Sequence, residues 1–168
     1  NSKKPDLWVH SPINLDGPMM QCLQELGTVK YIVTPNYEHT KFAYMWHQTY
    51  QDATMVGCPG LSERIPEISW TEIPYDYRPK SWNKDIKEPE GVCHTEILQA
   101  LHINVEKNPF TGRPFFNEVI FYHVPTKTLL TTDLFWNYPK NGVPNSEFGK
   151  DDSWQLAPVV DEVPLGSR

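Results

Sequence analysis

Residues 29–57 limit the possible folds of this chain more than any other segment. Residues 29–33 (VKYIV) are short and β-branched, which is typical of a buried strand. Phe42, Met45, Trp46, Thr49 and Tyr50 then recur at helical spacing, and residues 53–57 (ATMVG) form a second strand-like run. Strand, helix and strand within about 30 residues predict a βαβ unit with two parallel strands and a helix within residues 39–50.

The residues before this unit predict one more strand and helix. Residues 6–14 open with a short strand that Pro12 ends, because proline cannot donate to a ladder. Asp16 is placed to cap a helix that begins at Pro18, and Gly27 stands where a left-handed C-terminal residue is expected. The N-terminal half therefore indicates an α/β fold.

The C-terminal half is less regular. Residues 58–91 are punctuated by prolines, so we expect an ordered excursion with at most short helical turns. Residues 97–105 end as a strand, and residues 119–122 should pair antiparallel with residues 128–132 around the short loop VPTK. Residues 139–168 look like a loop-like tail. The simplest interpretation is a single α/β domain over residues 1–168.

Composition and charge exclude several classes of function. The net charge of −6 comes from dispersed carboxylates without a basic stripe, so nucleic acid is not an expected partner. Cys22, Cys58 and Cys93 lie far apart without C-x-x-C spacing, which predicts neither a disulfide framework nor a thiolate zinc site. The sequence contains no apolar run long enough for a transmembrane segment. With 16 prolines, 6 tryptophans and 8 tyrosines, the chain should carry aromatic side chains in ordered loops.

The loop TPNYEHT, residues 34–40, is the first candidate site, because polar loops at strand ends often carry the chemistry of α/β proteins. His39 could ligate a metal, Glu38 could act as a base or ligand, and Asn36 could position a substrate. The alternative is local: Asn36 or Thr40 caps the following helix and Glu38 favours its N-terminus.

Three further residues are candidates. Asp133 ends the run TLLTTDL, where a carboxylate either faces the same cleft as His39 or binds amides in a turn. His123 ends the partner strand and either approaches Asp133 or lies on the surface. Cys58, in a Gly-Cys-Pro-Gly loop, is a weaker candidate nucleophile, because nothing in the sequence predicts a lowered thiol pKa.

Three motifs taken together resemble a known family. LGTVKYIVTPN followed by His39, the Gly-Cys-Pro-Gly-Leu loop and TLLTTDL resemble a metallo-β-lactamase-like domain family of unknown function that is widespread in photosynthetic organisms. The resemblance covers most of residues 7–137. It implies an αβ/βα sandwich with two mixed sheets between outer helix layers, and this sequence would cover that fold incompletely at both ends.

The resemblance also implies that the metal site is dismantled. Hydrolases of this fold usually carry T-H-x-H-x-D-H after this strand, and Pro35, Tyr37 and Thr40 stand at the three histidine positions. His39 stands at the aspartate position, although the family commonly has histidines at both 39 and 40. Asp133 matches the metal-bridging carboxylate, so we expect it to share one cleft with His39. Two ligands are too few for a catalytic divalent metal, so no cofactor is expected, and any retained metal would use His39 and Asp133.

The resulting hypothesis is a pseudoenzyme that serves as a structural or interaction subunit through protein partners. The family distribution implies a chloroplast and a larger, membrane-associated photosynthetic assembly at the thylakoid, with no membrane span in this chain. Trp70, Trp82 and Trp154 are candidate contact residues in loops. The alternative is a metal-dependent hydrolase of a small ester or phosphoester with an altered site, and a third is an organic-ligand pocket lined by Tyr37, His39 and Trp136.

Overall fold

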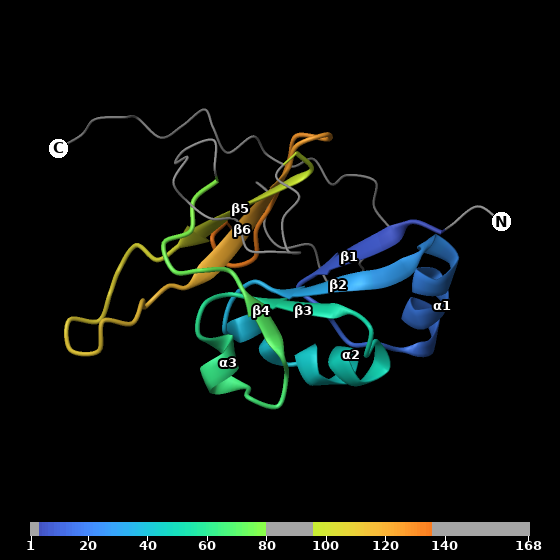
Figure 1. Ribbon diagram of the computed structural model, residues 1–168, viewed down its shortest axis with the longest axis horizontal. Coiled ribbons are helices and arrows are strands. Elements are labelled where there is room, and N and C mark those ends of the chain that lie inside the picture. The colour runs from blue at the N-terminus through green and yellow to red at the C-terminus, as the bar shows by residue number, and fades with distance from the viewer. Residues whose placement is uncertain (1–3, 80–95, 136–168) are drawn as a thin grey trace, which may run out of the picture. The chain divides into compact units, whose positions relative to one another are not determined.

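The computed structural model describes residues 4–79 and 96–135 (Figure 1). The chain divides into two compact units, Asn1–Thr132 and Asp133–Arg168. Every helix and strand given below belongs to the first unit, and Asp133, Leu134 and Phe135 are the described residues of the second. The expectation of a single domain over residues 1–168 therefore stays a prediction.

The first unit contains a four-stranded parallel sheet. Its strands are β1 Asp6–His10, β2 Thr28–Thr34, β3 Thr54–Gly57 and β4 Trp70–Glu72, arranged in the order β1-β2-β3-β4. The pairing of β2 with β3 confirms the βαβ unit that the helical and β-branched spacing of residues 29–57 predicts.

Four helical segments connect these strands. They are α1 Gly17–Leu26, the 3₁₀ turn η1 Glu38–Thr40, α2 Ala43–Thr49 and α3 Leu61–Arg64. Asp16 caps α1 as predicted, because its Oδ1 accepts a hydrogen bond from the Met19 amide at 2.9 Å. The helix predicted within residues 39–50 is confirmed as η1 and α2.

Gly27 does not have the left-handed conformation predicted for it. Its φ of 174° is extended backbone, and its amide donates to the Leu23 carbonyl. Glycine is needed here for space, since a Cβ atom would lie 2.3 Å from the Pro5 carbonyl oxygen. The prediction was wrong because glycine is required at position 27 by the close approach of the backbone at Pro5, just before β1. The spacing of residues in the sequence does not reveal that approach.

The expectation for residues 58–91 was also partly wrong. The segment contains α3 as a short helical turn, but it also contains β4, which pairs with β3 through Met55–Trp70, Val56–Thr71 and Gly57–Glu72. A strand of three residues between prolines is too short to show a two-residue period. Residues 80–91 lie outside the described residues.

A three-stranded antiparallel sheet follows, with β5 Leu98–Ile103, β6 Glu118–His123 and β7 Thr128–Leu130 in the order β5-β6-β7. The predicted antiparallel pairing is confirmed by Phe121–Leu130 and Tyr122–Leu129. The connecting turn contains Lys127 at a φ of 55°.

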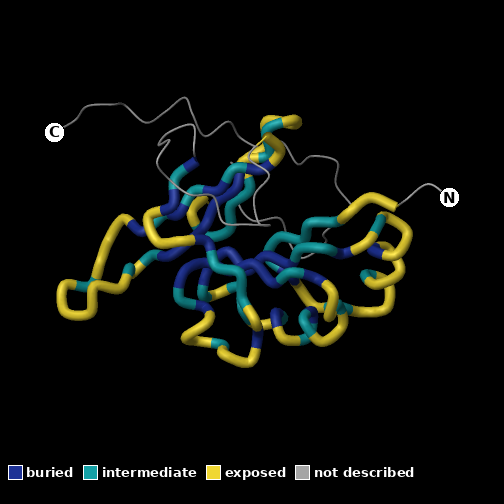
Figure 2. The backbone as a smooth tube through the Cα atoms, viewed as in Figure 1, coloured by how far each residue is buried: buried dark blue, intermediate teal, exposed yellow. Residues whose placement is uncertain are grey.

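The parallel sheet has a core on each face. On one face Ile32 and Met55 pack with Leu23 of α1 and Trp46 of α2. On the other face Val33 and Val56 pack with residues of the antiparallel sheet that include Leu98, Ala100, Val119 and Phe121. Figure 2 shows the corresponding buried backbone along the strands.

The described residues thus form a helix layer, a parallel sheet and an antiparallel sheet. The α/β class is confirmed. Within residues 4–79 and 96–135 each sheet is of one kind, so the expectation of mixed sheets is wrong for this part of the chain. The finer expectation of an αβ/βα sandwich stays a prediction.

The structure describes one of the tryptophans predicted to contact partners and tests part of the chain for membrane-spanning helices. Trp70 is half-buried and packs with both cores, and its Nε1 donates to the Ile65 carbonyl at 3.1 Å, so it is not an exposed anchor. Trp82, Trp136, Trp154 and the 139–168 tail lie outside the described residues. Within the described part of the chain, no helix has the length and apolar character needed to cross a bilayer.

Candidate functional site at the ends of the parallel strands

The C-terminal ends of β1 and β2 bring polar residues together, as expected for parallel strands. His10 ends β1, Ser11 follows it, and the loop with Asn36 and His39 follows β2. The Ser11 amide donates to the Val33 carbonyl at 2.8 Å, which holds the two strand ends side by side. Ser11 adopts a φ of 53°, a left-handed conformation that is uncommon for serine.

Asn36 organises the loop. It is buried, and its Oδ1 accepts hydrogen bonds from the amides of Glu38 and His39, both at 3.0 Å. Its Nδ2 donates to Thr132 Oγ1 at 3.0 Å. Asn36 therefore shapes a local turn, but the helix cap predicted for it is not formed, because neither η1 nor α2 has a side-chain cap. The Glu38 side chain is exposed to solvent. Thr40 also acts locally, since its Oγ1 donates to the Tyr37 carbonyl at 3.2 Å.

His39 lies beside His10, the last residue of β1, and Ser11, which follows it. Its Nδ1 shares a hydrogen bond with Ser11 Oγ. Burial, and then the nearby charge of His39, lowers the pKa of His10 to about 4, so His10 is neutral near pH 7. Two imidazole rings thus occupy this edge, and sequence analysis had singled out only one of them.

The His10 ring is packed between aromatic groups. It stacks on Trp8 with ring centroids 5.4 Å apart and meets the Phe121 ring edge-on at 5.9 Å. Its Nε2 atom is buried and has no hydrogen-bond partner among the described residues. A neutral imidazole can accept or donate at such a position, so this nitrogen has unused capacity within the described part of the chain.

Glu118 is a site residue that sequence analysis missed. It is fully buried at the start of β6 and forms an isolated antiparallel bridge with Asn36. Its Oε1 accepts from the Thr132 amide at 2.7 Å, and the neighbouring Val119 amide donates to the Pro35 carbonyl at 2.8 Å. The available sequence signal was an acidic residue opening the apolar run EVIF. We call His10, Ser11, Asn36, His39, Glu118 and Thr132 the strand-end cluster.

Two other predicted site residues are not part of this cluster as described. His123 ends β6, five residues or roughly 16 Å along the strand from Glu118. Its Nδ1 shares a hydrogen bond of 2.6 Å with Thr126 Oγ1 in the hairpin turn. Asp133 belongs to the second unit, so its shared cleft with His39 stays a prediction.

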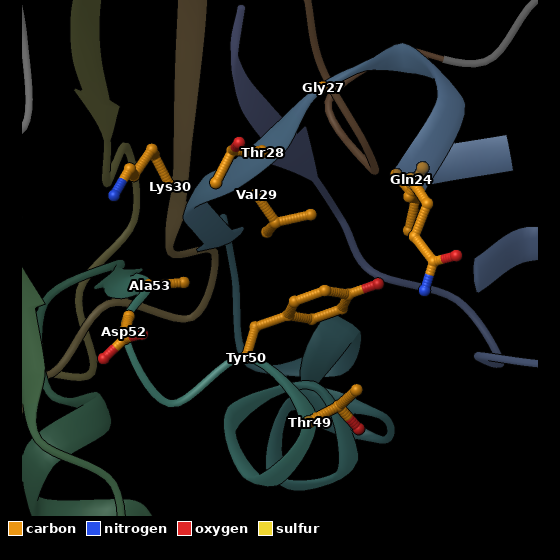
Figure 3. A pocket seen from close by; sticks show the side chains of 10 residues that line it. Gln24, Gly27, Thr28, Val29, Lys30, Thr49, Tyr50, Asp52 and Ala53 are labelled. Atoms are coloured by element: carbon orange, nitrogen blue, oxygen red, sulfur yellow. The ribbon is translucent and has the colours of Figure 1, made fainter. Parts of the chain in front are cut away.

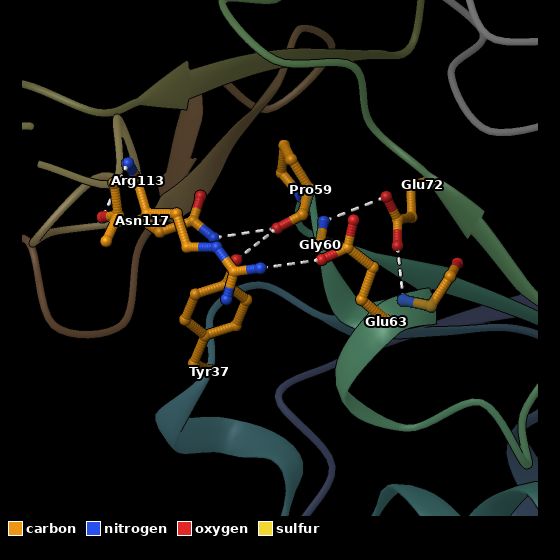
Figure 4. A network of polar contacts seen from close by, with 9 residues as sticks. Tyr37, Pro59, Gly60, Glu63, Glu72, Arg113 and Asn117 are labelled. Atoms are coloured by element: carbon orange, nitrogen blue, oxygen red, sulfur yellow. Dashed lines mark hydrogen bonds and ion pairs between the residues drawn. The ribbon is translucent and has the colours of Figure 1, made fainter.

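Tyr37 turns to the Gly-Cys-Pro-Gly loop (Figure 4). Its hydroxyl donates to the Pro59 carbonyl at 2.8 Å, and the Arg64 guanidinium lies 3.7 Å from its ring centroid. Burial, together with a hydrogen bond to Tyr75, raises the pKa of Tyr37 to about 12. Gly60, at a φ of 88°, leaves room for this contact, since a Cβ there would lie 2.5 Å from the Tyr37 hydroxyl.

The Gly-Cys-Pro-Gly loop is also held by a second set of polar groups, which includes the buried side chains of Asn117 and His102. Asn117 Nδ2 donates to the Pro59 carbonyl at 2.9 Å, and Asn117 Oδ1 lies 2.6 Å from His102 Nε2. His102 Nδ1 accepts from the Asp76 amide at 3.0 Å, so Nε2 carries the proton of a neutral ring. Burial lowers the pKa of His102. We call Pro59, Asp76, His102 and Asn117 the His102 network.

Cys58 does not have the surroundings of a nucleophile. It is fully buried, and burial raises its thiol pKa, with the Glu72 carboxylate adding to the effect. Glu72 itself accepts from the amides of Gly60 at 3.0 Å and Ser62 at 2.5 Å, which fixes the start of α3. The thiol is therefore part of the core.

A shallow hollow lies at the other end of the parallel sheet (Figure 3). It measures about 270 Å³ and is lined by Leu23, Val29, Tyr50 and Ala53, with Thr28, Lys30 and Asp52 among the polar lining residues. It surrounds the beginning of β2 and the turn between α2 and β3. It is separate from the strand-end cluster.

The described residues of the strand-end cluster offer imidazole, hydroxyl, amide and carboxylate groups. Among residues 4–79 and 96–135, no three His, Cys, Asp or Glu side chains come together as a metal-binding group. The organic-ligand pocket lined by Tyr37, His39 and Trp136 stays a prediction, because Trp136 is outside the described residues.

The fold and the cluster define an α/β domain with polar residues at the ends of its parallel strands. The chain belongs to a family described as a domain of unknown function, DUF4336, whose model matches residues 2–151. Neither the curated proteins nor the solved structures contain a match to this chain.

Proposed function

We propose that this chain is a catalytically degenerate metallo-β-lactamase-like domain that acts as a structural or interaction subunit. The observation that carries the proposal is the use of Tyr37. This residue stands at a metal-ligand position of the related hydrolases, and here its hydroxyl and ring are bound by the Pro59 carbonyl and Arg64. Tyr37 therefore links its own loop to the Gly-Cys-Pro-Gly loop and to α3.

The neighbouring residues of the loop support the same proposal. Pro35 stands at another histidine position, and its carbonyl accepts from the Val119 amide at 2.8 Å. Asn36 binds two amides of its own loop and Thr132. Groups that are engaged by the fold are not available to bind a metal without rearrangement, which is consistent with a domain that acts through its surface.

The proposed setting is a chloroplast assembly associated with the thylakoid membrane, through protein partners. This part of the proposal rests on the sequence resemblance to a family of photosynthetic organisms. Purification of the tagged chain from chloroplasts, with identification of the co-purifying proteins, tests it. We expect subunits of one photosynthetic complex in constant ratio. Recovery of the chain without any such complex would contradict the setting.

Elemental analysis and hydrolase assays test the loss of catalysis. We expect far less than one zinc, iron or manganese per chain and no turnover of carboxylic or phosphate esters. His39→Ala and the matched His47→Ala variant should then behave alike in both measurements. One metal per chain together with turnover that His39→Ala abolishes would refute the proposal.

A metal-dependent hydrolase with an altered site is the second candidate. The observation that favours it is the second imidazole, because His10 precedes Ser11, whose Oγ shares a hydrogen bond with His39 Nδ1. Imidazole is a common ligand of zinc and iron. Under this candidate, His10→Phe would lower the metal content as strongly as His39→Ala, whereas under the first proposal neither change affects it.

A further inference from the structure

Residues 105–116 form a projecting arm between β5 and β6 (Figure 1, yellow loop). The arm is an ordered ribbon: the Phe115 amide donates to the Glu106 carbonyl and the Asn108 amide to the Arg113 carbonyl, both at 2.8 Å. Figure 2 shows that most of the arm is exposed. Its position therefore depends on how its base is held.

Both ends of the arm are held by the His102 network. Asn117 follows the arm, and its Oδ1 accepts from His102 Nε2 at 2.6 Å. Asn104 precedes the arm, and its Nδ2 donates to Asp76 Oδ1 at 2.7 Å. Lys107, at the start of the arm, has its Nζ 3.7 Å from Asp76 Oδ2. Because the Asp76 amide donates to His102 Nδ1 at 3.0 Å, one imidazole ring joins the two ends.

The arm has a weaker attachment farther from its base. Arg113 Nη2 meets Glu63 Oε2 at 3.1 Å (Figure 4). Both of these side chains are largely exposed, and an ion pair in water adds little stability. His102 and Asn117 are buried, so the stronger attachment is the one at the base.

The His102 ring can join the two ends only while it is neutral. Its Nδ1 accepts from the Asp76 amide, and its Nε2 carries the proton that Asn117 Oδ1 accepts. A second proton has to go on Nδ1, where it would meet the proton of the Asp76 amide. Since an imidazolium has two donors and no acceptor, that hydrogen bond is then lost. Asp76 has a φ of 58°, a left-handed conformation that this hydrogen bond helps to hold.

The surroundings of the ring disfavour its charged form. His102 is fully buried, and this burial lowers its pKa. The Asp76 carboxylate favours the charged ring, whereas the Arg78 and Lys107 charges oppose it. Arg78 Nη1 also donates to the His102 carbonyl at 2.6 Å, and the Tyr75 ring lies edge-on at 5.7 Å. On the β6 side the ring meets a neutral amide. A protonated ring therefore gains free energy by leaving this position for water.

We propose that protonation of His102 releases the base of the arm while the two sheets remain folded. The neutral ring joins the Asp76 turn to Asn117, and the charged ring cannot. The arm carries Phe110, which is 95% exposed, so a surface contact made through the arm becomes dependent on pH. The inference goes beyond the function proposed above and does not depend on it.

The direction and size of the effect follow from the two protonation equilibria. In the released arm the ring is in water, where an imidazole has a pKa of about 6.5. In the closed arm its pKa is lower. Release therefore becomes more favourable as the pH falls below about 6.5, by up to about tenfold per pH unit, until the lowered pKa is reached. Above about pH 6.5 release does not depend on pH through this group.

Amide hydrogen exchange followed by NMR between pH 7 and 5 tests the proposal. The rates are expressed as protection factors, which remove the pH dependence of exchange in an unfolded chain. Asp76 reports the bond to the ring, and Phe115 reports the end of the arm near its base. We expect both factors to fall by up to about tenfold per pH unit below about 6.5. At every pH they should stay well below the factors of the β2 amides, because the sheet does not open with the arm.

Two variants assign the effect to His102. His102→Gln keeps a donor and an acceptor without a titrating group, so the fall at Asp76 and Phe115 should disappear. His10→Phe is the matched control, because it removes another histidine with a lowered pKa, and the fall should remain.

Three results would overturn the proposal. They are protection factors at the arm base that do not change with pH, factors equal to those of β2 at every pH, and a fall that persists in folded His102→Gln. If His102→Gln does not fold, the unmodified chain and His10→Phe still decide. A fall that is absent from His10→Phe, or that equals the fall in β2 in both size and level, would then exclude release by His102.

Discussion

The strand-end cluster and the His102 network use histidines in different ways, His102 being fully buried and His10 partly buried. Both nitrogens of His102 have fixed partners, the Asp76 amide and the Asn117 side chain. His10 instead has a buried Nε2 without a hydrogen-bond partner in the described part of the chain. A fully bonded ring holds a structure together, whereas the His10 ring keeps one nitrogen able to bond a further partner.

The largest effect should come from removing the bonded ring. His102→Leu leaves the Asp76 amide and the Asn117 carbonyl oxygen without their partner, which should cost about 4 kcal/mol of unfolding free energy. Urea unfolding measures it. His123→Leu is the matched control at a partly exposed hairpin position, where one hydrogen bond to Thr126 is lost, and it should change the free energy by less than about 1 kcal/mol. A similar loss of unfolding free energy in both variants would show that the buried hydrogen bonds of His102 add no special stability.

Acid should reveal the contribution of His10 next. Because the folded pKa of His10 is lowered to about 4 from 6.5, the unfolded chain binds more protons between those values. The stability contributed by His10 is then complete above about pH 6.5 and falls as the pH drops toward 4. Below pH 4 it changes no further, and the total loss is at most about 3.4 kcal/mol. His102 contributes in the same direction.

His10→Phe isolates the His10 contribution, since it keeps an aromatic ring between Trp8 and Phe121. Urea unfolding at several pH values should show a shallower loss for this variant than for the unmodified chain. An unchanged slope would mean that His10 is not the group that titrates.

A smaller effect compares two asparagines with the same local geometry. Asn36 and Asn108 each accept hydrogen bonds from two backbone amides, but Asn36 is buried and also donates to Thr132. Asn36→Ala should cost about 2 kcal/mol and Asn108→Ala about 0.5 to 1 kcal/mol. Thermal unfolding with a calorimetric enthalpy measures both. Equal costs would show that the cluster adds nothing to a simple turn.

Local patterns explain which parts of this fold were predictable from the sequence. The Asp16 cap and the β6–β7 hairpin depend on neighbours within a few residues, and each segment of the βαβ unit has its own hydrophobic spacing, so these elements are visible in the sequence. A local role for Asn36 was predicted for the same reason, although its side chain forms a turn with the Glu38 and His39 amides and caps neither η1 nor α2. The three-residue strand β4 has too few residues to show a period.

Long-range contacts explain the rest. Nothing near His102 in the sequence indicates Asp76 or Asn117, and nothing near Asn36 indicates Glu118. His10 appeared isolated because its neighbours, His39 and Phe121, come from other elements. The left-handed conformation of Ser11 follows from how the end of β1 meets β2, which no propensity of serine predicts.

The order of strands in the two sheets has a consequence for folding kinetics. In each sheet the neighbours in space are also neighbours along the chain, so every ladder closes a comparatively short loop. The contacts that join the sheets are far more distant in sequence, with Asn36 and Thr132 separated by 96 residues. Because long loops close at a greater entropic cost, the two sheets should form early and their junction late. Changes at that junction would then speed unfolding while leaving the folding rate nearly unaltered.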